Sequence, residues 1–104
     1  MKRYAFKMYL KPGYEAEYKH RHNTIWPELK ELLTKSGVCD YSIFFDHHTN
    51  TLFAVQKILR EGNSQDLGSN PVVEKWWAYM ADIMETNPDN SPVSIELVEL
   101  FYME

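Results

Sequence analysis

Two predicted strands in the middle of the chain limit the fold most, because both carry apolar residues on both faces. The apolar runs 38–45 and 51–59 flank a polar tip, residues 46–50, and this pattern is typical of a β-hairpin. A layer of helices covers only one face of a sheet, so the second face needs another cover, and the sheet of a partner chain is the simplest one. Strict alternation places Tyr41, Ile43 and Phe45 on one face of the first strand, and Val38 and Phe44 on the other.

The first part of the chain predicts a strand followed by an interrupted helix. Apolar residues alternate over residues 4–10, and an apolar face with helical spacing runs from Tyr14 to Leu32. Pro27 breaks this helix, because the residue before a proline avoids the helical region. We expect a kink or restart near Asn23-Thr24, where a capping side chain is available.

The last part of the chain predicts a loop, a helix and a strand. Residues 61–69 form a polar loop with room for one helical turn, and Asn70-Pro71 is a strong start for a helix that runs to about Met84. A final strand is expected over residues 93–102. The order βαββαβ predicts an α+β, ferredoxin-like sandwich, folded as one domain over residues 1–104.

Charge and composition exclude several classes of function. The net charge is −4 and no cluster of Lys or Arg is present, which argues against a nucleic-acid partner. The sole cysteine, Cys39, has no internal disulfide partner, which favours a reducing compartment. The N-terminus lacks the apolar run of a secretion signal, and no apolar stretch approaches the roughly 20 residues that cross a bilayer. We therefore expect a cytoplasmic protein without a membrane partner.

Trp76 and Trp77 are adjacent in the predicted second helix. Neighbouring helical side chains point about 100° apart, so one core-facing stripe does not bury both. One indole fills the core, and the other needs a second apolar surface, a partner chain or a flat ligand such as a sugar ring. The turn-rich loop 87–92 follows, either as a rigid connection or as the wall of a site that offers Asp89 and Asn90 to sugar hydroxyls.

Tyr18 and His22 lie four residues apart, so their side chains meet on one helical face. Histidine titrates near neutral pH and exchanges protons readily, although a histidine packed among core aromatics gives the same spacing. Tyr41 lies mid-strand, either as a core residue with a bonded hydroxyl or in a site. Arg21 and Glu17 are expected to form a solvated surface pair.

The remaining histidines do not predict a metal site. His20 and His22 are two residues apart, about 200° around a helix, and therefore face opposite sides. His47 and His48 are adjacent in a turn with no third ligand in evidence. Since metal ions need three or four converging groups, we expect no metal.

Three motifs together resemble the L-rhamnose mutarotase family, and the likeness covers nearly the whole chain. They are Arg21-His22-Asn23-x-Ile25-Trp26-Pro27-Glu28-Leu29, Trp76-Trp77-x-Tyr79-Met80-x-Asp82 and Asn87-Pro88-Asp89-Asn90-Ser91-Pro92-Val93. The terminal Phe101-Tyr102 also fits, whereas residues 60–70 fit less well.

The resemblance implies an enzyme that interconverts the α and β pyranose anomers of L-rhamnose by acid–base ring opening and closure, with no cofactor. It implies a homodimer, a dimeric α+β barrel in which two sheets pack face to face, with a monosaccharide site between the sheet and the helices of each subunit. It also implies His22 as the proton donor, with sugar contacts from Tyr18, Tyr41, Trp76 and Trp77.

Two other functions are open on the same barrel, since fold does not fix function. One is a cofactor-free monooxygenase or a haem-degrading enzyme, which for haem needs an axial histidine above a wide apolar cavity. A polar site lined by Tyr18, Asp89 and Asn90 argues against haem. The other is a sugar-binding module without catalysis.

Overall fold

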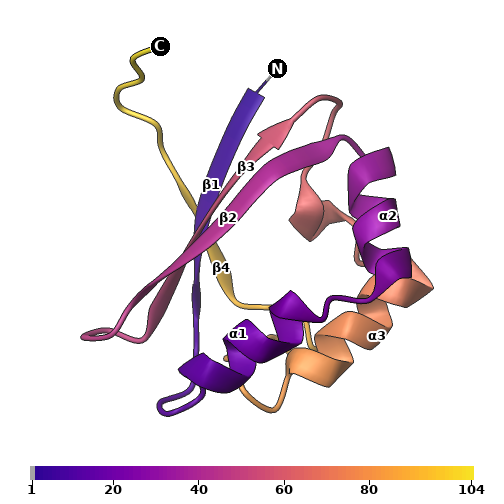
Figure 1. Ribbon diagram of the computed structural model, residues 1–104, viewed down its shortest axis with the longest axis vertical. Helices are drawn as coiled ribbons and strands as arrows, with labels where there is room; N and C mark the ends of the chain where they lie inside the picture. Colours follow the sequence, from indigo (N-terminus) through magenta and orange to yellow (C-terminus); the bar gives the residue numbers. More distant parts are fainter. Residues whose placement is uncertain (1) are drawn as a thin grey trace.

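A four-stranded antiparallel sheet and three α-helices make up the computed structural model, which describes residues 2–104 (Figure 1). The elements are β1 (Lys2–Tyr9), α1 (Glu15–Asn23), α2 (Pro27–Lys35), β2 (Val38–Asp46), β3 (Thr51–Ile58), the short 3₁₀ helix η1 (Ser64–Asp66), α3 (Pro71–Met80) and β4 (Ser94–Leu97). The strands lie in the order β2-β3-β1-β4. The predicted α+β, ferredoxin-like βαββαβ sandwich is therefore confirmed, with its first helix divided in two.

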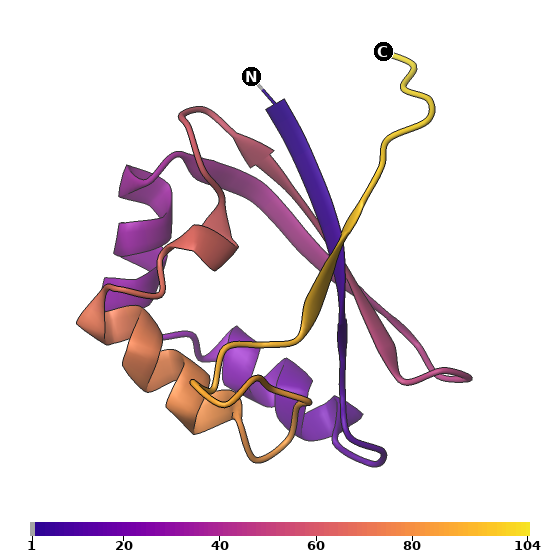
Figure 2. The same cartoon turned by 180° about the vertical axis from the view of Figure 1, so that it is seen from behind.

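All three helices cover the same face of the sheet, and the core lies between the two layers (Figures 1 and 2). Phe6, Leu52 and Ala54 project from the central strands and are almost fully buried. Val73 and Met80 of α3 pack against them. No helix among residues 2–104 is both long enough and apolar enough to cross a bilayer.

The opposite face of the sheet carries apolar residues that no helix covers. Lys7 of β1 pairs with Phe53 and with Ile95, and Phe53 pairs in turn with Phe44, so the four form one row across the sheet. Phe44 is 64% exposed and Ile95 is 46% exposed. We call this row and its neighbour Val55 the outer face.

A β-bulge in β2 changes which residues share a face. The register shifts between Cys39 and Ser42, and Asp40 adopts a left-handed φ of 46°. One extra residue restarts the alternation, so Val38 is buried on the helix side together with Tyr41. The expectation that Val38 lies on the same side as Phe44 is wrong for this reason.

The helix break at Pro27 is confirmed, but the predicted cap is wrong. α1 ends at Asn23 and α2 begins at Pro27, with Trp26 extended at the N-cap position and without a capping side-chain bond. Thr24 instead is the C-cap residue of α1, where its Oγ1 donates to the carbonyl of His20 at 3.0 Å. Pro27 has no backbone N–H, so one of the N–H groups that usually lack a partner at a helix start is absent. The start of α2 therefore requires less capping.

α3 starts as predicted and ends earlier than predicted. The side chain of Asn70 accepts a hydrogen bond from the backbone N–H of Val72 at 2.9 Å. The helix stops at Met80 rather than Met84, because the chain turns there to bring Met84 into a β-bridge with Leu10.

The other boundaries differ less, except at the last strand. β1, β2 and β3 differ from the expected bounds by at most two residues at either end, as element ends commonly do. The loop 61–69 contains the single helical turn η1. β4 spans only Ser94–Leu97 of the predicted residues 93–102. Beyond β4, one contact ties the C-terminal tail to the start of β1: Nε of Arg3 donates a hydrogen bond to Oε2 of Glu99 at 3.1 Å.

Candidate active site

An open cavity of about 1080 Å³ lies between the inner face of the sheet and the helices. Its volume slightly exceeds the range of about 300–1,000 Å³ that is typical of small-molecule sites. The five predicted site residues all line it: Tyr18 and His22 from α1, Tyr41 from β2, and Trp76 and Trp77 from α3. The structure thus brings together side chains that are up to 59 positions apart in the sequence, from position 18 to position 77.

The imidazole of His22 is held in a defined orientation by Tyr18. The two rings stack with centroids 4.2 Å apart and an interplanar angle of 24°. Nδ1 of His22 lies 3.1 Å from the backbone carbonyl oxygen of Tyr18. Because a carbonyl only accepts hydrogen bonds, the geometry assigns the proton to Nδ1 and leaves Nε2 as the nitrogen that exchanges protons.

Burial sets the protonation of the titratable groups around the cavity. It lowers the pKa of His22 below its usual 6.5, an effect that the Tyr18 carbonyl partly offsets. Burial also raises the pKa of Tyr18 well above 10. Burial raises the pKa of Tyr41 to about 12, although hydrogen bonds from Ser64 and Gln56 act in the opposite direction. At neutral pH the imidazole is therefore mostly uncharged, and both phenols remain hydrogen-bond donors.

The lowered pKa of His22 predicts that acid destabilises the fold. As the pH falls, the unfolded chain takes up a proton at His22 before the folded chain does. The folded state therefore keeps its full free energy of unfolding above pH 6.5, the usual pKa of histidine. It loses part of this free energy as the pH falls through the lower pKa of His22 in the folded chain. We expect His22→Gln to flatten this part of the curve of unfolding free energy against pH, measured by urea denaturation.

His20→Gln is the matched control for this measurement. His20 lies on the same helix and is exposed, so its replacement should keep the wild-type slope. An identical slope in His22→Gln and wild type would contradict the burial of a neutral imidazole.

The two adjacent indoles divide between the core and the cavity. Trp76 is only 8% exposed and meets His22 edge-on, with centroids 5.5 Å apart, and Trp26 edge-on at 5.1 Å. Trp77 is half-buried, and the far edge of its ring lies against Gly68, where an added Cβ would be only 2.7 Å from the indole. The second surface that Trp77 requires is therefore the segment after η1.

A buried polar pair fixes that segment to the sheet. Gln56 is fully buried on β3, and its side chain donates to Oγ of Ser64 at 2.9 Å and accepts from the backbone N–H of Ser64 at 3.0 Å. Ser64 and Gln65 line the cavity as a result. Sequence reasoning missed these residues. A glutamine at an inward position of an apolar strand is the signal that could have found them.

The predicted pair of Arg21 with Glu17 forms, but Arg21 is buried rather than solvated, so that part of the expectation is wrong. Its side chain is buried, donating from Nη1 and Nη2 to the two carboxylate oxygens of Asp82 at 2.9 and 3.2 Å and from Nε to Glu17 at 2.7 Å. A bidentate carboxylate satisfies the guanidinium donors, so the charge tolerates burial. The same hydrogen bonds lower the pKa of Asp82.

The loop 87–92 contributes less to the cavity than expected. Among the described residues, Pro92 is the only member of this loop that lines it. Asp89 and Asn90 are exposed, and Asp89 accepts a hydrogen bond from the backbone N–H of Ser91 at 3.0 Å. Asp89 therefore stabilises its own turn, and the interpretation of this loop as a rigid connection describes it better. Asp89 and Asn90 do not make the cavity polar, so they give no reason to exclude haem.

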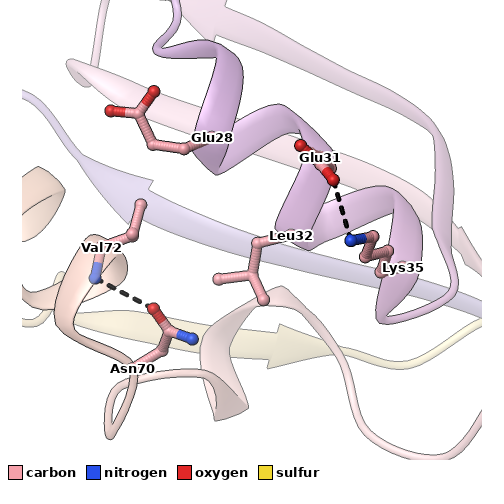
Figure 3. Close-up of a pocket in the computed structure, with 6 residues that line it drawn as sticks. All are labelled: Glu28, Glu31, Leu32, Lys35, Asn70 and Val72. Atoms are coloured by element: carbon pink, nitrogen blue, oxygen red, sulfur yellow. Dashed lines mark hydrogen bonds and ion pairs between the residues drawn. The ribbon is translucent and has the colours of Figure 1, made fainter.

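A smaller hollow of about 230 Å³ lies between α2 and the start of α3 (Figure 3). Lys35 pairs there with Glu31 at 2.8 Å, and Asn70 caps α3. None of the five predicted site residues lines it. Within residues 2–104, no three His, Cys, Asp or Glu side chains are grouped to hold a metal ion.

Fold and cavity together define a class: a ferredoxin-like α+β protein in which one oriented imidazole and several aromatic side chains line an open cavity between the sheet and the helices. The model of the family described as L-rhamnose mutarotase matches residues 3–103. The chain belongs to the L-rhamnose mutarotase family, isomerases that interconvert sugar anomers, and the predicted membership is confirmed.

Individual relatives resemble the chain over its whole length. It is 70% identical to an L-rhamnose mutarotase of Bacteroides thetaiotaomicron and 64% identical to one of Phocaeicola vulgatus, each comparison covering 100% of both chains. The crystal structure of an L-rhamnose mutarotase from Formosa agariphila superposes with a TM-score of 0.91 at 56% identity, again over 100% of both chains. Fold and family thus agree.

Proposed function

We propose that this chain interconverts the α and β pyranose anomers of L-rhamnose in the cavity beside His22. The observation that carries the proposal is the imidazole itself, anchored through Nδ1 to the Tyr18 carbonyl and stacked on the Tyr18 ring at the cavity wall. An imidazole whose orientation and tautomer are fixed is suited to proton exchange with a bound sugar.

The reaction needs one proton to leave the anomeric hydroxyl and one to reach the ring oxygen. As the bond between the anomeric carbon and the ring oxygen breaks, the sugar opens to the aldehyde, rotates about the neighbouring carbon–carbon bond and closes on the other face. Both oxygens are bonded to the same carbon, so Nε2 of His22 serves each in turn, first as base and then as acid. General acid–base catalysis of this kind contributes about 10²- to 10⁴-fold.

The surrounding side chains supply binding rather than proton transfer. Tyr18 and Tyr41 keep their phenolic protons, so they donate hydrogen bonds to ring hydroxyls. Trp77 is the more exposed indole and offers a flat surface to the C–H face of the sugar. Trp76 lies behind the imidazole and contacts its edge. The aromatic wall also gives the methyl group of rhamnose a dry environment, worth about 1–3 kcal/mol.

Saturation-transfer NMR on the two anomers of L-rhamnose tests the activity. We expect the protein to accelerate their exchange far above the buffer rate. Binding of rhamnose without acceleration would favour a non-catalytic module. Oxygen uptake, or a Soret band on haem addition, would favour the monooxygenase or haem alternative.

We also propose that the active form is a homodimer in which two outer faces pack together as a dimeric α+β barrel. The exposed Phe44 and Ile95, with half-buried Phe53 and Val55, form an apolar surface that one chain leaves uncovered. Light scattering on the wild type should give a molar mass of two chains. The Phe44→Asp variant should give a molar mass closer to that of a single chain. A wild-type monomer at micromolar concentration would contradict the proposal.

The remaining proposals concern organisation and location. Residues 1–104 act as one domain that works in the cytoplasm, with no cofactor and with a monosaccharide as its small-molecule partner. The free thiol of Cys39 supports a reducing compartment.

A further inference from the structure

α1 is attached to the rest of the molecule through few side chains. Its buried residues are Tyr18 and Arg21, and most of its other residues are polar. A helix with so narrow an apolar stripe gains little from hydrophobic burial. The position of α1, and of the imidazole it carries, therefore depends strongly on what Arg21 binds.

Arg21 binds the C-terminal end of α3. Its Nη1 donates to the backbone carbonyl oxygen of Tyr79 at 2.8 Å, besides the bonds to Asp82 in the turn that follows. The last carbonyls of a helix lack partners within the helix and carry partial negative charge, so a guanidinium is favourable there. The end of α3 lies beside α1 for this reason (Figures 1 and 2).

The same guanidinium contacts the aromatic cluster behind the cavity. Its central carbon lies 4.5 Å from the centroid of the Tyr79 ring. Tyr79 in turn packs against Trp76, with centroids 5.6 Å apart, and Trp76 meets His22 at 5.5 Å. Arg21 and His22 are neighbours in sequence, so two adjacent side chains of α1 touch α3 at two different places.

We propose that Arg21 is a positioning residue for the mutarotase reaction: by tying α1 to the end of α3, it fixes the distance between the imidazole of His22 and the indoles of α3. The inference rests on the proposed function of His22. Arg21 lies outside the set of residues that line the cavity, so it acts through helix placement and not through sugar contact. A displacement of about 1 Å at a reacting group costs up to roughly 10²-fold in rate.

Steady-state exchange kinetics on Arg21→Gln, Arg21→Lys and Asp82→Asn test the proposal. We expect kcat for L-rhamnose to fall about 10- to 100-fold in Arg21→Gln, with KM little changed and with Arg21→Lys in between. Asp82→Asn keeps the bond from Arg21 to the Tyr79 carbonyl, so it should fold even if Arg21→Gln does not, and its kcat should fall by several-fold to about tenfold.

Glu31→Gln is the matched control, because it removes a similarly exposed carboxylate from the surface pair with Lys35. Its kcat should equal that of wild type. A wild-type kcat in folded Asp82→Asn, a change in KM alone, or an equal loss in Glu31→Gln would overturn the positioning role. Absence of exchange in the wild type would instead refute the proposed function itself.

Discussion

Replacing His22 with alanine is expected to slow the exchange of L-rhamnose anomers by about 10²- to 10⁴-fold. The imidazole is the group at the cavity whose lowered pKa and fixed orientation suit it to pass a proton between two oxygens near neutral pH. Tyr18 and Tyr41, by contrast, hold their protons too firmly to act as bases. The fold should survive, because His22 lies at the wall of a cavity that is already open.

Saturation transfer between the anomeric protons measures this loss directly. His20→Ala changes an exposed histidine two positions away on the same helix and should keep the wild-type rate. Circular dichroism would verify that both variants fold. Unchanged exchange in a folded His22→Ala variant would remove the imidazole from the mechanism.

Trp77→Ala is expected to weaken the binding of L-rhamnose by about 10- to 100-fold, roughly 1.4–2.8 kcal/mol. The half-buried indole lines the cavity, so its loss would remove a flat apolar surface from the proposed sugar site. Its contribution to the core is smaller, because only part of the ring packs there.

Trp76→Ala is the matched comparison, since it removes the same side chain one position earlier. Trp76 is buried among Trp26, Tyr79 and His22, so we expect a loss of about 3–5 kcal/mol in the free energy of unfolding. Titration calorimetry and thermal unfolding together separate the two effects. A larger drop in melting temperature for Trp77→Ala than for Trp76→Ala would assign Trp77 to the core.

Local patterns in the sequence predicted the elements well where a short-range rule governs them. The helix start at Asn70-Pro71 and the break at Pro27 depend on backbone chemistry within a few residues. The early end of α3 does not follow from such a local rule. Ile83 and Met84 are buried in the turn as they would be in a helix, so apolar spacing alone does not distinguish the two.

In the candidate site too, some features follow from neighbouring residues and others depend on distant parts of the chain. The contact between Tyr18 and His22 follows from their spacing of four on a helix. Alternation also places Tyr41 on the face of Ile43 and Phe45, but the side on which Val38 lies depends on the bulge near Asp40, which the alternation pattern does not contain. The burial of Arg21 depends on Asp82, 61 positions away, and no local pattern reports so distant an ion pair.

The most direct test of the account is the distance from Nε2 of His22 to the sugar in a crystal structure with L-rhamnose bound. We expect Nε2 to lie within about 3.2 Å of the ring oxygen or the anomeric oxygen, with the sugar against Trp77. A rhamnose bound with both oxygens beyond the reach of His22, or bound outside this cavity, would contradict it.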